Sequence, residues 1–308
     1  MAYETGTATN HSDLLDKLIT FATAHGWVLT EDNRGATVKT IILQGTGAGG
    51  SDEIFVGVRL YADTVTDRFG WALQGYTGHN AGVAWSAQPG AIGETTTTPL
   101  PCVPLWNDAI TYWFTVSATR MFVVAKVGTS YEWAGLGYAI LPYATPGQWP
   151  YPLVVAGSAL GELRYSDTTT KHTHGLIPLA TGQTVGTLRI RDAAGVWRSP
   201  QITMGGSAGL TQSGTWPFAE FNVSQYGGMT NLVPVGGVWT LQPIIAFEAG
   251  AAGDLYRGDE FGEFDGCKHV AGLANAAENT ITVGGDTYLV VKNAFRSAGG
   301  DFWALLLA

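Results

Sequence analysis

The carboxylates between residues 254 and 265 are the side chains in this sequence that come closest to a catalytic pattern. A glycoside hydrolase needs two such groups, about 5 Å or roughly 6.5–9.5 Å apart, beside the sugar bond. Asp254, Glu260 and Glu263 have the right chemistry, but nothing in their spacing places one opposite a partner. No serine is associated with a convincing histidine and aspartate. We therefore predict that the chain is not an enzyme and has no catalytic residues.

Two groups of side chains could bind a metal ion. His172 and His174 would point to the same side of a strand, but zinc needs two further ligands and the nearest acid is Asp167. The second group is residues 265–269, which contain Asp265, Cys267 and His269, directly after three acids, Asp259, Glu260 and Glu263. These carboxylates could hold calcium, or the site could take zinc, yet the spacing departs from the calcium-binding Asp-x-Asp-x-Asp-Gly loop. We predict a solvated polar loop and an acidic turn, without a metal.

The glycine-rich segment 45–51 resembles a nucleotide-binding loop superficially. A Walker A loop would need Lys-Ser/Thr after its last glycine, and a dinucleotide fingerprint would have to open a helix. Here the glycines precede an apparent strand, residues 54–60, so we predict a hairpin turn and no cofactor. Cys102 and Cys267 are too few for a disulfide framework, and we expect two free, buried thiols in a reducing compartment.

Charge and composition exclude several classes of protein. The chain has 308 residues and a net charge of −9, and its densest basic stretch is Arg189, Arg191 and Arg198, so we expect no nucleic-acid partner. Only 13% of residues are charged while 45% are hydrophobic, which excludes disorder and a coiled coil. The uncharged stretch 133–161 contains four closely spaced prolines, so we expect no membrane span. The N-terminus has neither the basic nor the apolar region of a secretory signal.

One segment has the apolar spacing of a helix. Leucine, isoleucine and alanine recur at positions 14, 15, 18, 19 and 22, which lie on one face at 3.6 residues per turn. Asn10 or Ser12 can cap the start, and Gly26 can end the helix. The spacing predicts an amphipathic helix over residues 12–25.

After Gly26 the apolar period becomes two, which is typical of strands. Segments 38–43 and 53–61 flank the glycine-rich turn, and a closing strand is expected over residues 301–308. Two hairpins are expected, residues 111–116 with 120–127 and residues 279–283 with 287–292, the second through Gly284-Gly285-Asp286. We predict a mostly β, β-sandwich-like fold of antiparallel sheets with one short N-terminal amphipathic helix. A proline-rich stretch and the polar loop 166–174 place a boundary near residue 160, giving domains 1–160 and 161–308, with one compact unit as the alternative.

Long uncharged spans suggest contact with other subunits. Glu220 is the only charge between Arg198 and Glu248, and Glu94 and Asp108 are the only ones between Arg68 and Arg120. Obligate interfaces are poor in charge and rich in tryptophan. We therefore interpret these spans as surface covered in a larger assembly, anchored by Trp85, Trp106, Trp113, Trp216 and Trp239. The polar arm formed by residues 1–10 could dock on an adjacent subunit, and its deletion should then leave the fold intact.

Several segments of the sequence resemble segments of structural proteins of tailed bacteriophages. They cover both ends and the middle of the chain, whereas residues 166–250 are the least similar part. The similar segments are residues 3–18, 26–28, 52–59, 104–107, 110–114, 122–127, 138–153 and 288–296. The resemblance implies a virion component of the tail or baseplate region, assembled in the bacterial cytoplasm, without known chemistry. Its partners would be copies of itself and other virion proteins. The alternatives are a glycan-binding or glycan-cleaving module of the tail tip, whose partner is a host surface glycan, and placement in the head.

Overall fold

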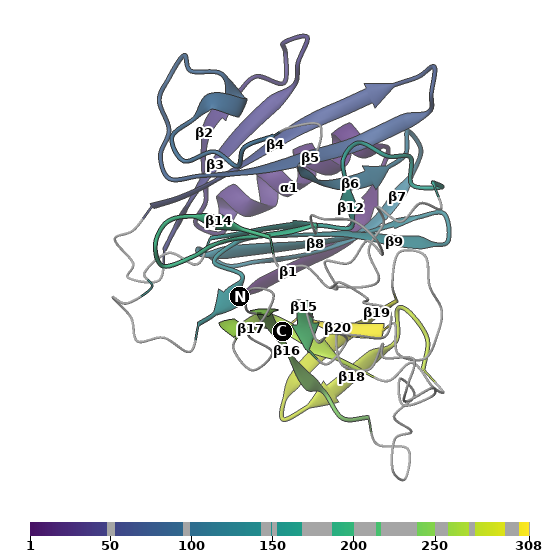
Figure 1. Cartoon of the computed structure of the whole chain (residues 1–308). Coiled ribbons are helices and arrows are strands. Elements are labelled where there is room, and N and C mark those ends of the chain that lie inside the picture. The colour runs from purple at the N-terminus through teal and green to yellow at the C-terminus, as the bar shows by residue number, and fades with distance from the viewer. Residues whose placement is uncertain are drawn as a thin grey trace, which may run out of the picture.

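The computed structural model describes residues 1–47, 53–94, 99–142, 149, 153–167, 187–199, 214–216, 239–249, 258–270, 275–292 and 302–307. Within these residues the chain forms three antiparallel sheets and one α-helix, arranged as stacked layers (Figure 1). The predicted mostly β fold with a single N-terminal α-helix is confirmed. Among the described residues no helix has the length and apolar character needed to cross a membrane.

The middle layer, which we call the central sheet, has seven strands. In spatial order they are β1 (Ala2–Ala8), β7 (Ile110–Val116), β8 (Arg120–Val127), β9 (Ser130–Gly137), β11 (Val154–Gly157), β13 (Leu188–Arg191) and β14 (Trp197–Arg198). β7 and β8 form the first predicted hairpin. The central sheet continues across residue 160, because β13 pairs with β11. The predicted domain boundary at that residue stays a prediction.

The second layer, the helix-side sheet, has six strands. Their order is β12 (Ala159–Leu160), β6 (Pro101–Leu105), β5 (Arg68–Tyr76), β4 (Glu53–Asp63), β3 (Thr40–Thr46) and β2 (Val28–Asp32). The two strands predicted beside the glycine-rich turn are β3 and β4, which pair from Thr40–Arg59 to Thr46–Glu53. A short 3-10 helix, η1 (Trp85–Ala87), lies in the connection after β5.

The third layer, the C-terminal sheet, is ordered β15 (Gly214–Trp216), β16 (Gln242–Ala249), β17 (Gly258–His269), β20 (Phe302–Leu306), β19 (Asp286–Lys292) and β18 (Thr280–Val283). A short strand, β10 (Ile140–Leu141), also pairs with β17. β18 and β19 form the second predicted hairpin, whose Gly284 and Gly285 both have positive φ, as a two-residue primed turn requires. β20 is the predicted closing strand.

The inner strands of the central sheet are buried on both faces. Along β8, Met121, Val123 and Ala125 belong to the core shared with the helix-side sheet. The alternate residues Phe122 and Val124 belong to the core shared with the C-terminal sheet. Successive side chains of a strand point to opposite faces of the sheet, so a strand that lies between two cores must have an apolar residue at nearly every position. This burial accounts for strands that carry so few charges.

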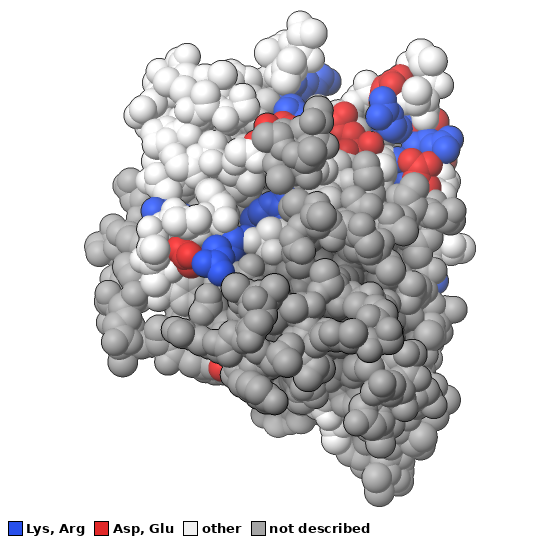
Figure 2. All heavy atoms as spheres, viewed as in Figure 1, with Lys and Arg blue, Asp and Glu red and all other residues white. Residues whose placement is uncertain are grey.

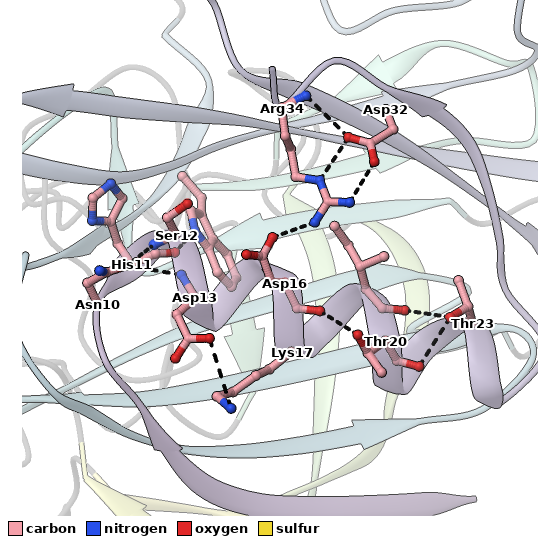
Figure 3. Close-up of polar contacts among 12 residues, drawn as sticks. Asn10, His11, Ser12, Asp13, Asp16, Lys17, Thr20, Thr23, Asp32 and Arg34 are labelled. Carbon is pink, nitrogen blue, oxygen red and sulfur yellow. Dashed lines mark hydrogen bonds and ion pairs between the residues drawn. The ribbon is translucent and has the colours of Figure 1, made fainter. Parts of the chain in front are cut away.

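The helix α1 (His11–Ala24) lies between the helix-side and central sheets (Figure 1). Of the two proposed caps, Asn10 is the one used: its Oδ1 accepts hydrogen bonds from the backbone N–H groups of Ser12, at 2.9 Å, and Asp13, at 3.0 Å (Figure 3). Figure 3 also shows Arg34, from the β2–β3 connection, paired with Asp16 on the helix and with Asp32. These contacts join the helix to the edge of the helix-side sheet.

Candidate functional site

The predicted acidic turn at residues 259–269 is wrong, because these residues lie in strand β17 (Gly258–His269). Gly262 and Gly266 have φ values of 132° and 75°, which favour glycine and interrupt the strand's regular alternation. A Cβ atom on Gly266 would lie 2.7 Å from Nη2 of Arg120. The glycine therefore allows a guanidinium from the central sheet to approach the C-terminal sheet.

Two carboxylates of β17, those of Glu263 and Asp265, are bound to cations. Asp265 forms an ion pair with Nε of the buried Arg120, whose guanidinium also lies 5.6 Å from the ring centre of Phe122. Glu263 forms an ion pair with Lys268. Asp265 therefore links two layers of the fold, and neither carboxylate is arranged as a free acid or base for glycoside cleavage.

Metal-binding patterns gain no support from the described residues, which contain no cluster of three or more histidine, cysteine, aspartate or glutamate side chains. His172, His174 and Asp254 lie outside these residues. Cys102 and Cys267 are free and buried, as predicted, and burial raises the pKa of both thiols. A buried thiol that stays protonated is a poor nucleophile and a poor ligand.

Two glycine-rich segments of the sequence bear on nucleotide binding and on catalysis. The glycine-rich segment 45–51 connects β3 to β4, so it precedes a strand as predicted, although residues 48–52 are outside the described part. We expected no Gly-x-Ser-x-Gly nucleophile turn in this sequence, but that expectation was wrong, because residues 205–209 read Gly-Gly-Ser-Ala-Gly and match its spacing. They too lie outside the described residues, so the strand and helix that such a turn requires are not tested.

The tryptophans correct our interpretation of the uncharged spans. Trp85 and Trp113 are 7% and 8% exposed and belong to the chain's own cores, so they are not free to anchor a neighbour. Trp106 and Trp239 are partly buried against these cores, and the side chain of Trp216 is not described. In strands β5, β6 and β7 the missing charges thus reflect burial inside one chain, whereas the uncharged residues 77–84 are exposed or partly buried.

Charged side chains on the helix-side sheet occur largely as opposite pairs. Arg59 lies 3.5 Å from Glu94 and 3.2 Å from Glu162, and Arg68 lies 3.2 Å from Asp63. On the face in Figure 2, positive and negative side chains accordingly lie next to each other. Of the densest basic stretch, Arg189 is buried and donates hydrogen bonds to protein oxygens.

The N-terminal arm is not free, which corrects a second expectation. Residues 2–8 form β1, which pairs with β7 in an unbroken register from Ala2–Val116 to Ala8–Ile110. Glu4 accepts a hydrogen bond from the Tyr112 hydroxyl at 2.7 Å, and the Thr5 hydroxyl donates to the Tyr112 carbonyl at 2.9 Å. Deletion of residues 1–10 would remove a strand and the Asn10 cap, so it would not leave the fold intact.

The outer edges of the sheets differ in how well they are protected against pairing with other chains. Natural edge strands are kept short, charged, bulged or proline-containing for this purpose. β2 has a bulge between Leu29 and Glu31 and carries two acids, while β12 and β14 have two residues each. β1 has seven regularly paired residues with no bulge, proline or lysine. β1 is therefore the longest unprotected edge in the described part of the chain.

We call the outer side of residues 2–8 the β1 edge. Tyr3, Thr5 and Thr7 alternate with more buried residues, and Tyr3 is 47% exposed. The one charged residue, Glu4, has its carboxylate bonded to the neighbouring strand. Among the described residues no strand pairs with the outer side of β1, and an edge flanked by hydroxyls and one aromatic ring is suited to accept a further strand.

A second edge has similar properties. β18 consists of Thr280, Ile281, Thr282 and Val283, all of them β-branched and uncharged. Val283 is exposed, and β18 ends the order of the C-terminal sheet. We call this the β18 edge. Together the two edges offer strand-pairing positions on two different layers.

No family model matches the chain, and no curated protein matches its sequence. The resemblance to phage structural proteins therefore rests on the sequence segments described above.

Proposed function

We propose that this protein is a non-enzymatic structural subunit of a tailed-bacteriophage particle, in the tail or baseplate region. It would act by multi-copy assembly with itself and with other virion proteins. The observation that carries this proposal is the β1 edge, which ends the central sheet among the described strands and lacks the bulge, proline or lysine that usually protects such an edge.

The arrangement of the two edges favours assembly over a monomeric role. A strand added to a sheet edge gains main-chain hydrogen bonds, and exposed side chains set the register. Because the β1 and β18 edges belong to different sheets, one subunit could contact two neighbours. Assembly through edges also agrees with a chain whose buried tryptophans serve its own core.

The proposal is tested by quantitative mass spectrometry of density-purified phage particles, scaled to the major tail-tube protein. We expect this chain at a fixed ratio of a few to a few dozen copies per particle. That ratio would also narrow the layer to which it belongs. Absence from purified particles would contradict the proposal.

Binding of a host glycan is the second candidate, and one observation favours it. Trp106 and Tyr165 form an edge-to-face pair, 5.4 Å between ring centres, at the margin of the core. Asn107 and Asp108, both exposed, follow Trp106 directly and could bind sugar hydroxyls. Titration of tryptophan fluorescence with host surface polysaccharide tests this role, and Trp106→Ala should abolish any response. An equal response from Trp106→Ala would exclude this site.

A further inference from the structure

We propose that the β1 edges of two copies of this chain pair with each other, antiparallel, about a two-fold axis that passes through Thr5. The inference rests on the proposed function, because it names the partner of the assembly edge. The pairing would join two seven-stranded central sheets into one continuous sheet. It would also place the matching layers of the two copies on the same side.

The sequence of β1 is complementary to itself in this register. Thr5 lies opposite its own copy, Tyr3 opposite Thr7, and Ala2 opposite Ala8. Aromatic rings and threonines are favourable cross-strand neighbours, and the two-fold axis creates the Tyr3–Thr7 pair twice. The residues that alternate to the exposed side, Tyr3, Thr5 and Thr7, therefore meet one another and not the more buried set.

The register also avoids a direct clash of charge. Glu4 lies opposite Gly6, which has no side chain, and its carboxylate is already bonded to Tyr112. The two Glu4 residues are diagonal neighbours, roughly 7–8 Å apart between Cα atoms. Their repulsion, and that between two copies of net charge −9, is weakened by salt. We thus expect pairing to strengthen as ionic strength rises.

A second copy fits the β1 edge better than the other edge defined here. β18 has four residues, so it would leave part of the seven-residue β1 edge unpaired. Two β1 strands match over their full length. An isologous contact of this kind closes as a dimer and does not propagate.

Crosslinking with a short bismaleimide tests the register. Thr5→Cys should give a covalent dimer, because residues at the two-fold axis face each other at about 5 Å. Tyr3→Cys alone and Thr7→Cys alone should give no covalent dimer, whereas a mixture of the two variants should crosslink, because Tyr3 lies opposite Thr7. Thr20→Cys, exposed on α1, measures random collision, and the two native thiols are buried.

Thr5→Lys supplies an independent measurement, since it places like charges opposite each other at the axis. By sedimentation we expect at least about tenfold weaker dimerisation than for Thr5→Ser, with an unchanged near-ultraviolet circular dichroism spectrum. Thr5→Cys crosslinking no higher than that of Thr20→Cys, in solution and in purified particles, would overturn the inference. If the chain is nevertheless found in purified particles, the absence of the β1–β1 dimer does not contradict the proposed function. Crosslinking in solution combined with absence from particles would contradict the function and retain the dimer.

Discussion

A carboxyl group enclosed in the core makes the stability of this protein depend on pH. Glu132 lies on β9, on the same face as Ala134 and Leu136, in the core between the central and helix-side sheets. Its side chain is fully buried, and Ser158 donates a hydrogen bond to its Oε2. Burial raises the pKa of Glu132 from 4.5 to about 8, an effect that the Ser158 hydrogen bond partly opposes. The group is therefore protonated in the folded protein at neutral pH.

The magnitude follows from the difference in proton binding between the two states. Above pH 4.5 the unfolded chain releases the Glu132 proton, while the folded chain keeps it up to about pH 8. The free energy of unfolding consequently falls as pH rises through this window. One pKa unit corresponds to about 1.4 kcal/mol, so the full loss is about 5 kcal/mol.

Glu132→Gln should remove this loss, because the amide has the shape of the protonated carboxyl and never ionises. We expect the variant to be about 3–5 kcal/mol more stable than the wild type at pH 8. At pH 4.5 the two should agree within about 1 kcal/mol, the usual net effect of one altered hydrogen bond. Urea denaturation followed by tryptophan fluorescence at both pH values measures the difference.

Glu260→Gln is the matched control, since Glu260 is an exposed carboxylate on β17. It should change stability little and equally at both pH values. A Glu132→Gln variant with the same relative stability at pH 4.5 and pH 8 would refute the reasoning. That result would mean that the folded protein holds Glu132 ionised at neutral pH.

Three further predictions concern other parts of the molecule. Burial lowers the pKa of His11 from 6.5 to about 4, and the nearby Lys39 contributes. As pH falls through this range, the free energy of unfolding of the wild type should therefore fall by about 3 kcal/mol. His11→Phe should remove this loss of stability, which urea denaturation measures. Gly57→Ala should cost about 1–3 kcal/mol in thermal denaturation, because its Cβ would lie 2.4 Å from the Tyr76 hydroxyl oxygen; Gly35→Ala, with open space around it, should be nearly neutral. Val283→Lys should lower light scattering at high protein concentration with little change in melting temperature, because it charges an exposed edge; unchanged scattering would exclude β18 as a self-association site.

Local signals predicted the elements whose apolar pattern is strong. The helix was expected over residues 12–25 and forms over His11–Ala24, because its apolar face and Asn10 cap are encoded within a few residues. The glycine pair at 284–285 likewise determined a hairpin through its backbone conformation. These features depend on neighbours close in the chain, and a sequence shows such neighbours directly.

Features that depend on distant residues were harder to predict. Residues 2–8 alternate between exposed and more buried positions, but most of their side chains are small or polar, and their partner β7 begins at Ile110. The acidic residues of β17 suggested a turn, although a buried arginine on another sheet binds one of them. Uncharged strands were interpreted as external interfaces because composition does not distinguish burial inside one chain from burial between chains.

The pairing of β1 with β7 also sets an order of events during synthesis. The first strand leaves the ribosome about 100 residues before its partner. At about 5–20 residues per second, this leaves β1 without its intramolecular partner for roughly 5–20 seconds. During that time both of its edges are accessible, so neighbouring nascent chains on one messenger could meet through β1 before either chain has folded.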